Sequence, residues 1–414
     1  MNAYLAIVLA AIVGEYLLAF ITEWLNLRHI STELPDEFRQ QYDADRYRTS
    51  QRYLRANTRL GLANRTVFTL ATVAFILAGG FGWLDRLVRL PDMGPIATGL
   101  AFVAVLALGS QILRLPFSVY ETFAIEQHYG FNRTTPRTFV ADRLKEWTLL
   151  AIVGGALYAA VLWLFGRWGP SAWLACWAAV TGIQILVLSI APVVILPLFN
   201  KFTPLEDADA RRAIESYARA QQFRTQGIFT MDGSRRSSKS NAFFTGFGRF
   251  RRIVLYDTLV AKHSADELVA IVAHEMGHYR KHHILRFLIV SGATSAGMFF
   301  LLSLLINNRG LFDAFQVRDL SIYASLVFAA FLYSPLGVLL SVLTNILSRR
   351  FEYQADAYAL ASSGLAQPMI AALKKLTVDN LGNLSPHPLK VFLDYSHPPI
   401  LDRIRSLQCP PSPG

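Results

Sequence analysis

Two histidines, His274 and His278, stand four residues apart in the stretch VAHEMGHYRKHH, and Glu275 directly follows the first. On a helix, residues four apart share one face, so both imidazoles can reach the same metal ion. Zinc binds histidine nitrogens at about 2.0–2.1 Å, and a catalytic site leaves one coordination position for water. Glu275 is rotated by about 100° from His274, so it can act on that water as a general base without binding the ion. The spacing therefore predicts hydrolysis by a zinc-activated water.

The surrounding sequence bears on whether this motif is a chance arrangement of polar residues. Ser264 and Glu267 have the spacing of a capping box, in which each side chain bonds the backbone N–H of the other residue. The metal motif is then expected two turns into a capped helix, at the membrane surface or slightly within it. His282 and His283 fall off the face of the histidine pair, and we expect them to be surface or interface residues.

A site with two histidines needs a third protein ligand. The stretch RRFEYQADAYALASSG offers Glu352 and Asp356, again four residues apart. Glu352 can complete the coordination sphere of one zinc ion per chain. Asp356 can accept the N–H of a ligating histidine and so fix the tautomer of its ring. The competing interpretation is a surface ion pair between Glu352 and Arg349.

The elements that must position these residues include long apolar segments. The chain has 414 residues, of which 53% are hydrophobic. These residues gather in long blocks, and a helix needs about 20 apolar residues to span a bilayer. A single block could be a buried core helix, but seven predict a multi-pass membrane protein. The expected spans are Ala3–Leu27, Val67–Leu84, Ile96–Leu113, Trp147–Phe165, Trp173–Leu198, Ile284–Ile306 and Ile322–Leu347. The first has no basic residue before it and contains Glu15 and Glu23, so we expect it to be retained rather than cleaved as a signal peptide.

The basic residues predict an orientation. The segments between spans one and two and between spans three and four carry thirteen Lys and Arg residues, against five in the alternate segments. Because basic loops face the cytoplasm, the N-terminus is expected outside, and the catalytic region and C-terminus inside. The formal charge of +11 is then explained by topology, and no nucleic-acid partner is predicted. The bilayer is the expected surrounding, and the sequence does not indicate an oligomeric state.

Five parts are expected along the chain. They are residues 1–198 with five spans, 199–283 with the HEMGH helix, 284–347 with spans six and seven, 348–407 with the third ligand, and 408–414 as a disordered tail. Within the second part, Leu205–Phe223 is expected to be an amphipathic helix, and RIVLYD has the composition of a strand. The two cysteines, Cys176 and Cys409, exclude a disulfide framework and a thiolate metal site.

The motifs together resemble those of a known family. HEMGH, followed by two spans and then FEYQADAYA, resembles the type I CAAX prenyl proteases, which are integral-membrane zinc metalloendopeptidases of the gluzincin kind. Further similar stretches are ETFAIEQHYGFNRTT, LPLFNKFTPLED, SNAFFTGFGRFRRIVLYDTL and DYSHPPILDRI. The resemblance therefore runs over nearly the whole chain.

The resemblance implies a mainly α fold with seven transmembrane helices that form a barrel around an internal chamber, plus a cytoplasmic-side, zincin-like α+β catalytic domain. It implies zinc bound by His274, His278 and Glu352, with Glu275 as base and acid. It further implies that Asn241 holds the substrate backbone and that His397 stabilises the oxyanion; without it, both would be interpreted as turn residues. Arg403 is expected to pair with a site carboxylate. Four acids, which would be costly against lipid, should face the chamber: Glu15, Glu23, Glu121 and Glu126.

The implied substrate is a prenylated protein that ends in C-a-a-X and loses its last three residues. A chamber with an apolar lining would equally suit a damaged membrane segment, so a quality-control zinc protease without prenyl specificity is the alternative. Another membrane zincin, of the site-two or heat-shock type, is a further enzyme class. A transporter or channel is the non-enzyme alternative, but it leaves Glu275 and Glu352 without a purpose.

Overall fold

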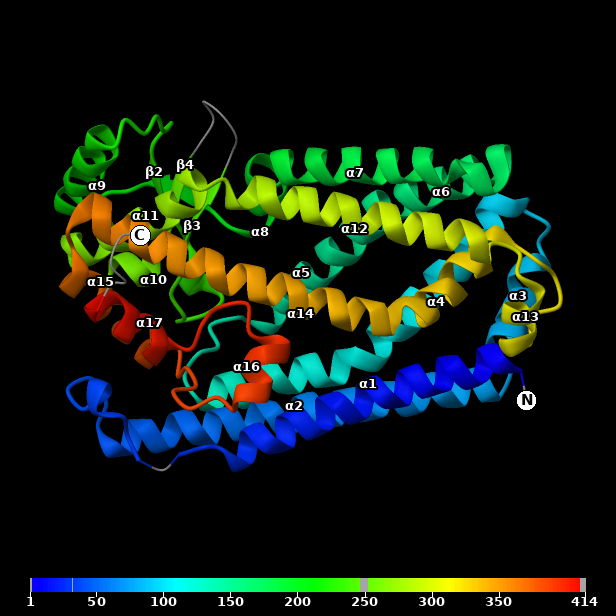
Figure 1. Cartoon of the computed structure of the whole chain (residues 1–414), viewed down its shortest axis with the longest axis horizontal. Helices are drawn as coiled ribbons and strands as arrows, with labels where there is room; N and C mark the ends of the chain where they lie inside the picture. Colours follow the sequence, from blue (N-terminus) through cyan, green and yellow to red (C-terminus); the bar gives the residue numbers. More distant parts are fainter. Residues whose placement is uncertain (1, 32, 246–251, 410–414) are drawn as a thin grey trace.

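The computed structural model of the chain describes residues 2–31, 33–245 and 252–409. Figure 1 shows an elongated bundle of helices, with a small sheet and several short helices gathered at the end that also holds the described C-terminus. The tail expected to be disordered, 408–414, lies outside the described residues from residue 410 onward. The architecture is mainly helical, with one four-stranded sheet in the described part of the chain.

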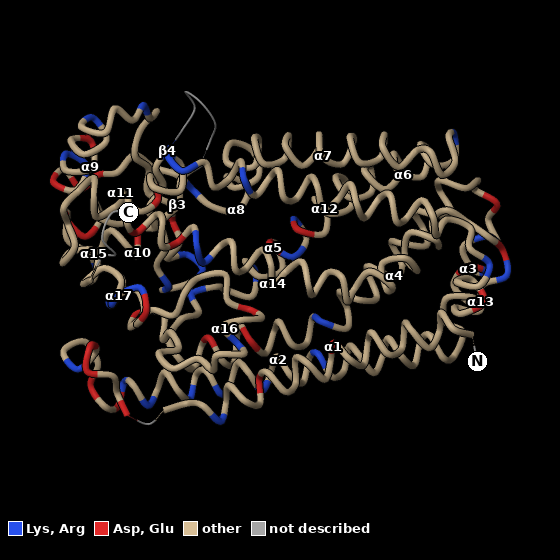
Figure 2. Tube along the Cα trace, viewed as in Figure 1, with Lys and Arg blue, Asp and Glu red and all other residues tan. Residues whose placement is uncertain are grey.

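Six described helical segments are long and apolar enough to cross a membrane: Ala3–Arg28, Ala44–Leu77, Gly94–Glu126, Pro136–Phe199, His283–Leu305 and Ile322–Ser363. Figure 2 shows why they suit a bilayer, because charged residues gather toward the two ends of the bundle and the stretch between them is mostly uncharged. The chain is therefore a multi-pass integral membrane protein.

The elongated bundle contains α1 (Ala3–Arg28), α2 (Ala44–Leu77), α3 (Gly80–Arg89), α4 (Pro95–Tyr120), α5 (Pro136–Leu149), α6 (Gly155–Trp168), α7 (Trp173–Ile190), α12 (His283–Leu305) and α14 (Ile322–Ser363). The other α-helices are α8 (Leu196–Phe199), α9 (Ala208–Ala220), α10 (Asp257–Val260), α11 (Ala265–Arg280), α13 (Arg309–Ala314), α15 (Ala366–Asp379), α16 (Pro388–Asp394) and α17 (Ile400–Gln408).

The expected second span, Val67–Leu84, is not a single helix. Helix α2 ends at Leu77, and Gly79 adopts a left-handed backbone with φ of 70° before α3 begins. Glycine reaches this conformation without the steric cost that a side chain would add. The helix therefore begins well before Val67, and much of the basic segment expected to be a loop is the first half of α2.

The run Pro136–Phe199 contains the fourth and fifth expected spans. At 1.5 Å per residue, a straight helix of its 64 residues would be about three times as long as a bilayer core is thick. Gly169, with φ of 58°, ends α6, and Figure 1 shows that α7 runs back beside it.

The sheet belongs to the compact end of the molecule. Its strands are β1 (Phe202–Pro204), β2 (Ile228–Met231), β3 (Ala242–Thr245) and β4 (Arg252–Tyr256), in the order β1-β2-β4-β3. β2 and β4 are parallel and the other pairs are antiparallel. The order places β3 at one edge of the described sheet. The strand predicted from RIVLYD is confirmed, and three of its side chains, Ile253, Val254 and Leu255, are buried. The amphipathic helix predicted over Leu205–Phe223 is confirmed with the shorter bounds of α9.

The capping box that starts α11 is also confirmed. Ser264 Oγ accepts the Glu267 N–H at 3.3 Å, and Glu267 Oε2 accepts the Ser264 N–H at 2.9 Å. Lys375 Nζ of α15 donates to the same carboxylate at 2.8 Å, which ties α15 to the start of α11. The helix that carries HEMGH is thus fixed at its first turn.

Candidate metal centre

The structure brings together three side chains that could hold a metal ion. His274 and His278 lie on α11, and Glu352 lies on α14, with their donor atoms within 4.8 Å of one another. The two histidine Nε2 atoms are 3.2 Å apart. Glu352 Oε2 lies 3.5 Å from His274 Nε2, and Glu352 Oε1 lies 3.2 Å from His278 Nε2. Two helices that are distant in sequence therefore face each other across one cluster.

The cluster fits a tetrahedral cation such as zinc. Ligands placed tetrahedrally at about 2.1 Å from an ion lie about 3.4 Å from one another, which matches these separations. Asp356 Oδ1 lies 2.7 Å from His274 Nδ1, so the ring proton belongs on that nitrogen and the lone pair on Nε2. Glu352 Oε2 is buried, and among the described residues it has ion-pair contacts with His274 and Arg403 but no hydrogen bond of good geometry. A cation would satisfy both the facing lone pairs and this oxygen.

Arg403, on α17, binds both carboxylates of α14. Its Nε and Nη2 donate to Asp356 at 2.8 and 2.6 Å, and its Nη1 lies 3.2 Å from Glu352 Oε2. A bidentate guanidinium–carboxylate pair is strong and fixes both planes. The expectation that Arg403 pairs with one carboxylate was too narrow, since it contacts two. Arg349 instead donates to the Val391 and Tyr395 carbonyls, so no surface pair with Glu352 forms.

The electrostatics of α11 suit acid–base chemistry. Burial raises the pKa of the Glu275 carboxyl, although His274 and His278 oppose the change. Burial lowers the pKa of His274, but the neighbouring Asp356 and Glu352 carboxylates, which accept from the ring, outweigh burial and raise the pKa to about 9. Without a metal, a proton therefore competes for the His274 imidazole, and metal binding must release it.

The two residues expected at the substrate lie at different distances from the cluster. His397, in the turn before α17, is largely exposed, and its Nε2 lies 3.5 Å from Glu352 Oε1. Asn241 is exposed and directly precedes the edge strand β3, which packs beside α11. Its Oδ1 accepts the Ala242 N–H at 2.9 Å, and no described contact joins its side chain to the cluster.

The prediction that His282 and His283 are surface or interface residues is wrong for one of them. His282 is exposed, but His283 is only 1% exposed, and its Nδ1 lies 2.9 Å from His278 Nδ1. The reason is the end of α11 at Arg280: His282 takes a left-handed backbone with φ of 55°, and a new helix begins at His283. A helical projection carried past Arg280 therefore points His283 the wrong way. The sequence did contain a signal for this position: His283 stands at the start of an apolar segment, and a buried histidine ring there needs a polar partner.

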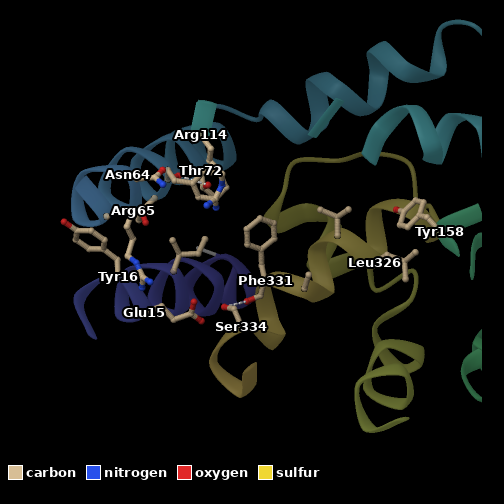
Figure 3. Close-up of a pocket in the computed structure, with 16 residues that line it drawn as sticks. Glu15, Tyr16, Asn64, Arg65, Thr72, Arg114, Tyr158, Leu326, Phe331 and Ser334 are labelled. Carbon is tan, nitrogen blue, oxygen red and sulfur yellow. Dashed lines mark hydrogen bonds between the residues drawn. The ribbon is translucent and has the colours of Figure 1, made fainter. Parts of the chain in front are cut away.

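The acids expected to face an interior have varied surroundings. Glu15 lines a cavity of about 810 Å³ between α1, α2, α4, α6 and α14, with Tyr16 and Arg65 nearby (Figure 3). Glu121 and Glu126 line a second cavity of about 460 Å³. Glu126 also bonds Lys239, and Glu23 bonds Lys390; both lysines come from the end of the molecule that holds the sheet.

The close approach of α11 and α14 depends on Gly277. A Cβ at this position would lie 2.9 Å from Ala355 Cα and 3.0 Å from its carbonyl oxygen, and backbone cannot move aside cheaply. We expect Gly277→Ala to lower the free energy of unfolding by about 1–3 kcal/mol, measured by thermal unfolding in detergent. Gly297→Ala, at a helical glycine with open space around it, is the control and should be neutral or slightly stabilising. Equal behaviour of the two variants would contradict tight packing at Gly277.

Comparison with known proteins gives matches over most of the chain. Residues 23–201 match the family described as CAAX prenyl protease N-terminal, five membrane helices, and residues 204–410 match peptidase family M48. The chain is 34% identical to the CAAX prenyl protease 1 homolog of Arabidopsis thaliana over 96% of each protein. It is 32% identical to CAAX prenyl protease 1 of Saccharomyces cerevisiae, over 91% of this chain and 88% of that protein. The crystal structure of S. mikatae Ste24p superposes with a TM-score of 0.93 at 30% identity, over 98% of this chain and 99% of that one.

Proposed function

Because the chain belongs to peptidase family M48 and is a membrane metalloendopeptidase of the CAAX prenyl protease type, we propose that it removes the C-terminal tripeptide of prenylated proteins with one zinc ion. The observation that carries the proposal is the cluster of His274, His278 and Glu352, whose donor atoms have the spacing of tetrahedral ligands. The name of the relatives supplies the substrate class.

Each site residue then has a chemical task. A bound zinc ion would acidify a water molecule and polarise the scissile carbonyl. Glu275 takes the proton of the attacking water and returns it to the leaving amine. His397 donates to the oxyanion from the exposed side of Glu352, and Asn241 holds the substrate backbone beside the edge strand β3. Asp356 keeps the His274 proton on Nδ1.

Seven membrane crossings and a cytoplasmic catalytic region complete the proposal. The reversal at Gly169 divides the long run into two crossings, α5–α6 and α7, which raises six candidate segments to seven. The basic connections lie at the catalytic end, since Asn132 pairs with Ser237 and Arg405 binds Glu37. Basic residues favour the cytoplasmic side, so the metal centre is assigned to it and the N-terminus to the outside.

The chamber is assigned to the lipid part of the substrate. The cavity that Glu15 lines also has Ile12, Phe68, Leu326 and Phe331 in its wall, and apolar contacts of this kind suit a prenyl chain. The same wall would accept an unfolded membrane segment, which is the quality-control alternative. The match of residues 23–201 to the five-helix region favours the CAAX type over membrane zincins that lack that region.

Peptide cleavage by the purified protein in detergent tests the function. A farnesylated peptide ending in C-a-a-X is compared with its unprenylated twin, and release of the tripeptide is measured by mass spectrometry. We expect cleavage of the farnesylated peptide and little of its twin. Equal cleavage of both would keep the protease and overturn prenyl specificity. No cleavage of either peptide by zinc-loaded protein would overturn the proposed reaction.

Metal content tests the ligand set. We expect about one zinc per chain in the purified protein, and Glu352→Ala should lose most of it, because two histidines alone leave the site one protein ligand short. Elemental analysis after dialysis gives the ratio. Glu146→Ala, at an exposed acid of α5 in an ion pair with Arg143, should keep the metal. Full zinc occupancy in Glu352→Ala would remove Glu352 from the ligand set.

A further inference from the structure

His283 forms a hydrogen-bonded connection between the two helices that supply the metal ligands. Its Nδ1 lies 2.9 Å from His278 Nδ1, and its Nε2 lies 3.0 Å from Gln354 Oε1. Gln354 lies on α14, two residues after Glu352. The ring of His283 stacks on Phe351, with centroids 4.0 Å apart and planes 5° apart. Both nitrogens of this buried ring are therefore occupied, and the ring cannot turn freely.

The positions of the protons in this connection depend on one another. Two ring nitrogens 2.9 Å apart share one proton, because two N–H groups would repel each other and two lone pairs would not bond. If Gln354 accepts from His283 Nε2, then His283 Nδ1 is the acceptor and His278 Nδ1 the donor. The lone pair of His278 then lies on Nε2, the atom that faces His274 and Glu352. The reverse assignment would place a proton on that Nε2 and block the metal.

We propose that His283 and Gln354 are positioning residues that hold His278 in the tautomer that binds the metal. They do for His278 what Asp356 does for His274, with a neutral imidazole in place of a carboxylate. The inference rests on the proposed function, since it concerns the ligands of that metal. It explains why a histidine at the start of an apolar helix is almost completely buried.

Two substitutions separate the hydrogen bond from the packing. His283→Asn keeps an acceptor where Nδ1 stands but loses the ring, whereas His283→Phe keeps a ring against Phe351 but loses the acceptor. We expect His283→Phe to raise the zinc Kd by about 10–100-fold, the usual cost of removing such a partner, and His283→Asn to stay nearer the parent protein. The Kd is measured by competition with a zinc chelator in detergent, and His282→Asn is the exposed neighbouring control.

Gln354 provides a second test at a distance from the metal. Gln354→Glu keeps the acceptor and should preserve zinc affinity. Gln354→Lys offers a donor instead, which forces the unfavourable tautomer, so the zinc Kd should rise. Ala357→Lys adds the same charge at an exposed position of the same helix and controls for simple repulsion. Cobalt substitution gives an independent readout, because the absorption bands of bound Co²⁺ should shift in His283→Phe and not in His282→Asn.

The outcomes separate the tautomer role of His283 from the proposed metalloprotease function on which it rests. Failure of the parent protein to bind zinc would overturn the proposed metal centre. Tight zinc binding by the parent together with an unchanged Kd in His283→Phe would overturn only the tautomer role. A larger loss in His283→Asn than in His283→Phe would assign the effect to ring packing and also overturn it.

Discussion

Replacing Glu275 by Gln is expected to lower kcat for peptide cleavage by about 10²–10⁴-fold while leaving one zinc per chain bound. Glutamine keeps the shape of the side chain but cannot take a proton from water. Glu275 stands next to His274 on α11, but its carboxylate is not among the clustered donor atoms, so the metal should remain. Cleavage rate and zinc content are measured on the same preparation. Loss of both together would show that Glu275 holds the metal rather than acting as a base.

Asp266→Asn provides the matched control, because it makes the same chemical change at an exposed position of the same helix. It should leave the cleavage rate within about twofold of the parent, as surface changes usually do.

The pH dependence of cleavage adds a second check on the role of Glu275. Glu275 must be ionised to accept a proton, so activity rises as pH increases through its pKa. Burial raises that pKa and a bound cation opposes the rise, so the pH at which kcat/KM increases reports the balance of the two effects.

The local parts of the site could be predicted from the sequence. The spacing of His274 and His278 and the capping box at Ser264 follow from helix geometry, which depends only on neighbouring residues. Glu352 and Asp356 share a helical face for the same reason. The meeting of α11 with α14 is a tertiary contact that helix geometry does not predict. The need of two histidines for a third ligand pointed to Glu352, and the resemblance to a known family supported that pairing.

The parts that the sequence did not predict are those where a helix stops. The break at Gly79 ended the helix of one expected span before Leu84, and the break after Arg280 turned His283 toward His278. Both depend on one residue in a left-handed backbone, which hydropathy does not report. The double contact of Arg403 was also missed, because α17 reaches the site from the end of the chain and its register on α14 is set by packing.

The network around Arg403 gives the largest expected effect on stability. Arg403, Glu352 and Asp356 are 8%, 4% and 2% exposed, and the single positive charge of the arginine contacts both carboxylates. Replacing it by Met leaves two buried negative charges around the metal site. We expect Arg403→Met to lower the free energy of unfolding by about 3–5 kcal/mol, measured by thermal or denaturant unfolding in detergent.

Arg405→Met is the matched control on the same helix, because that side chain is 63% exposed and its pair with Glu37 should contribute at most about 1 kcal/mol. A similar loss in both variants would contradict a special role for Arg403.

The loss of stability in Arg403→Met should be larger in metal-free protein, since a bound cation replaces part of the missing positive charge. Arg403→Lys should lie between the parent and Met, because one ammonium group cannot reproduce the paired bonds to Asp356. Stability and metal binding at this site are therefore expected to change together, through the two carboxylates of α14.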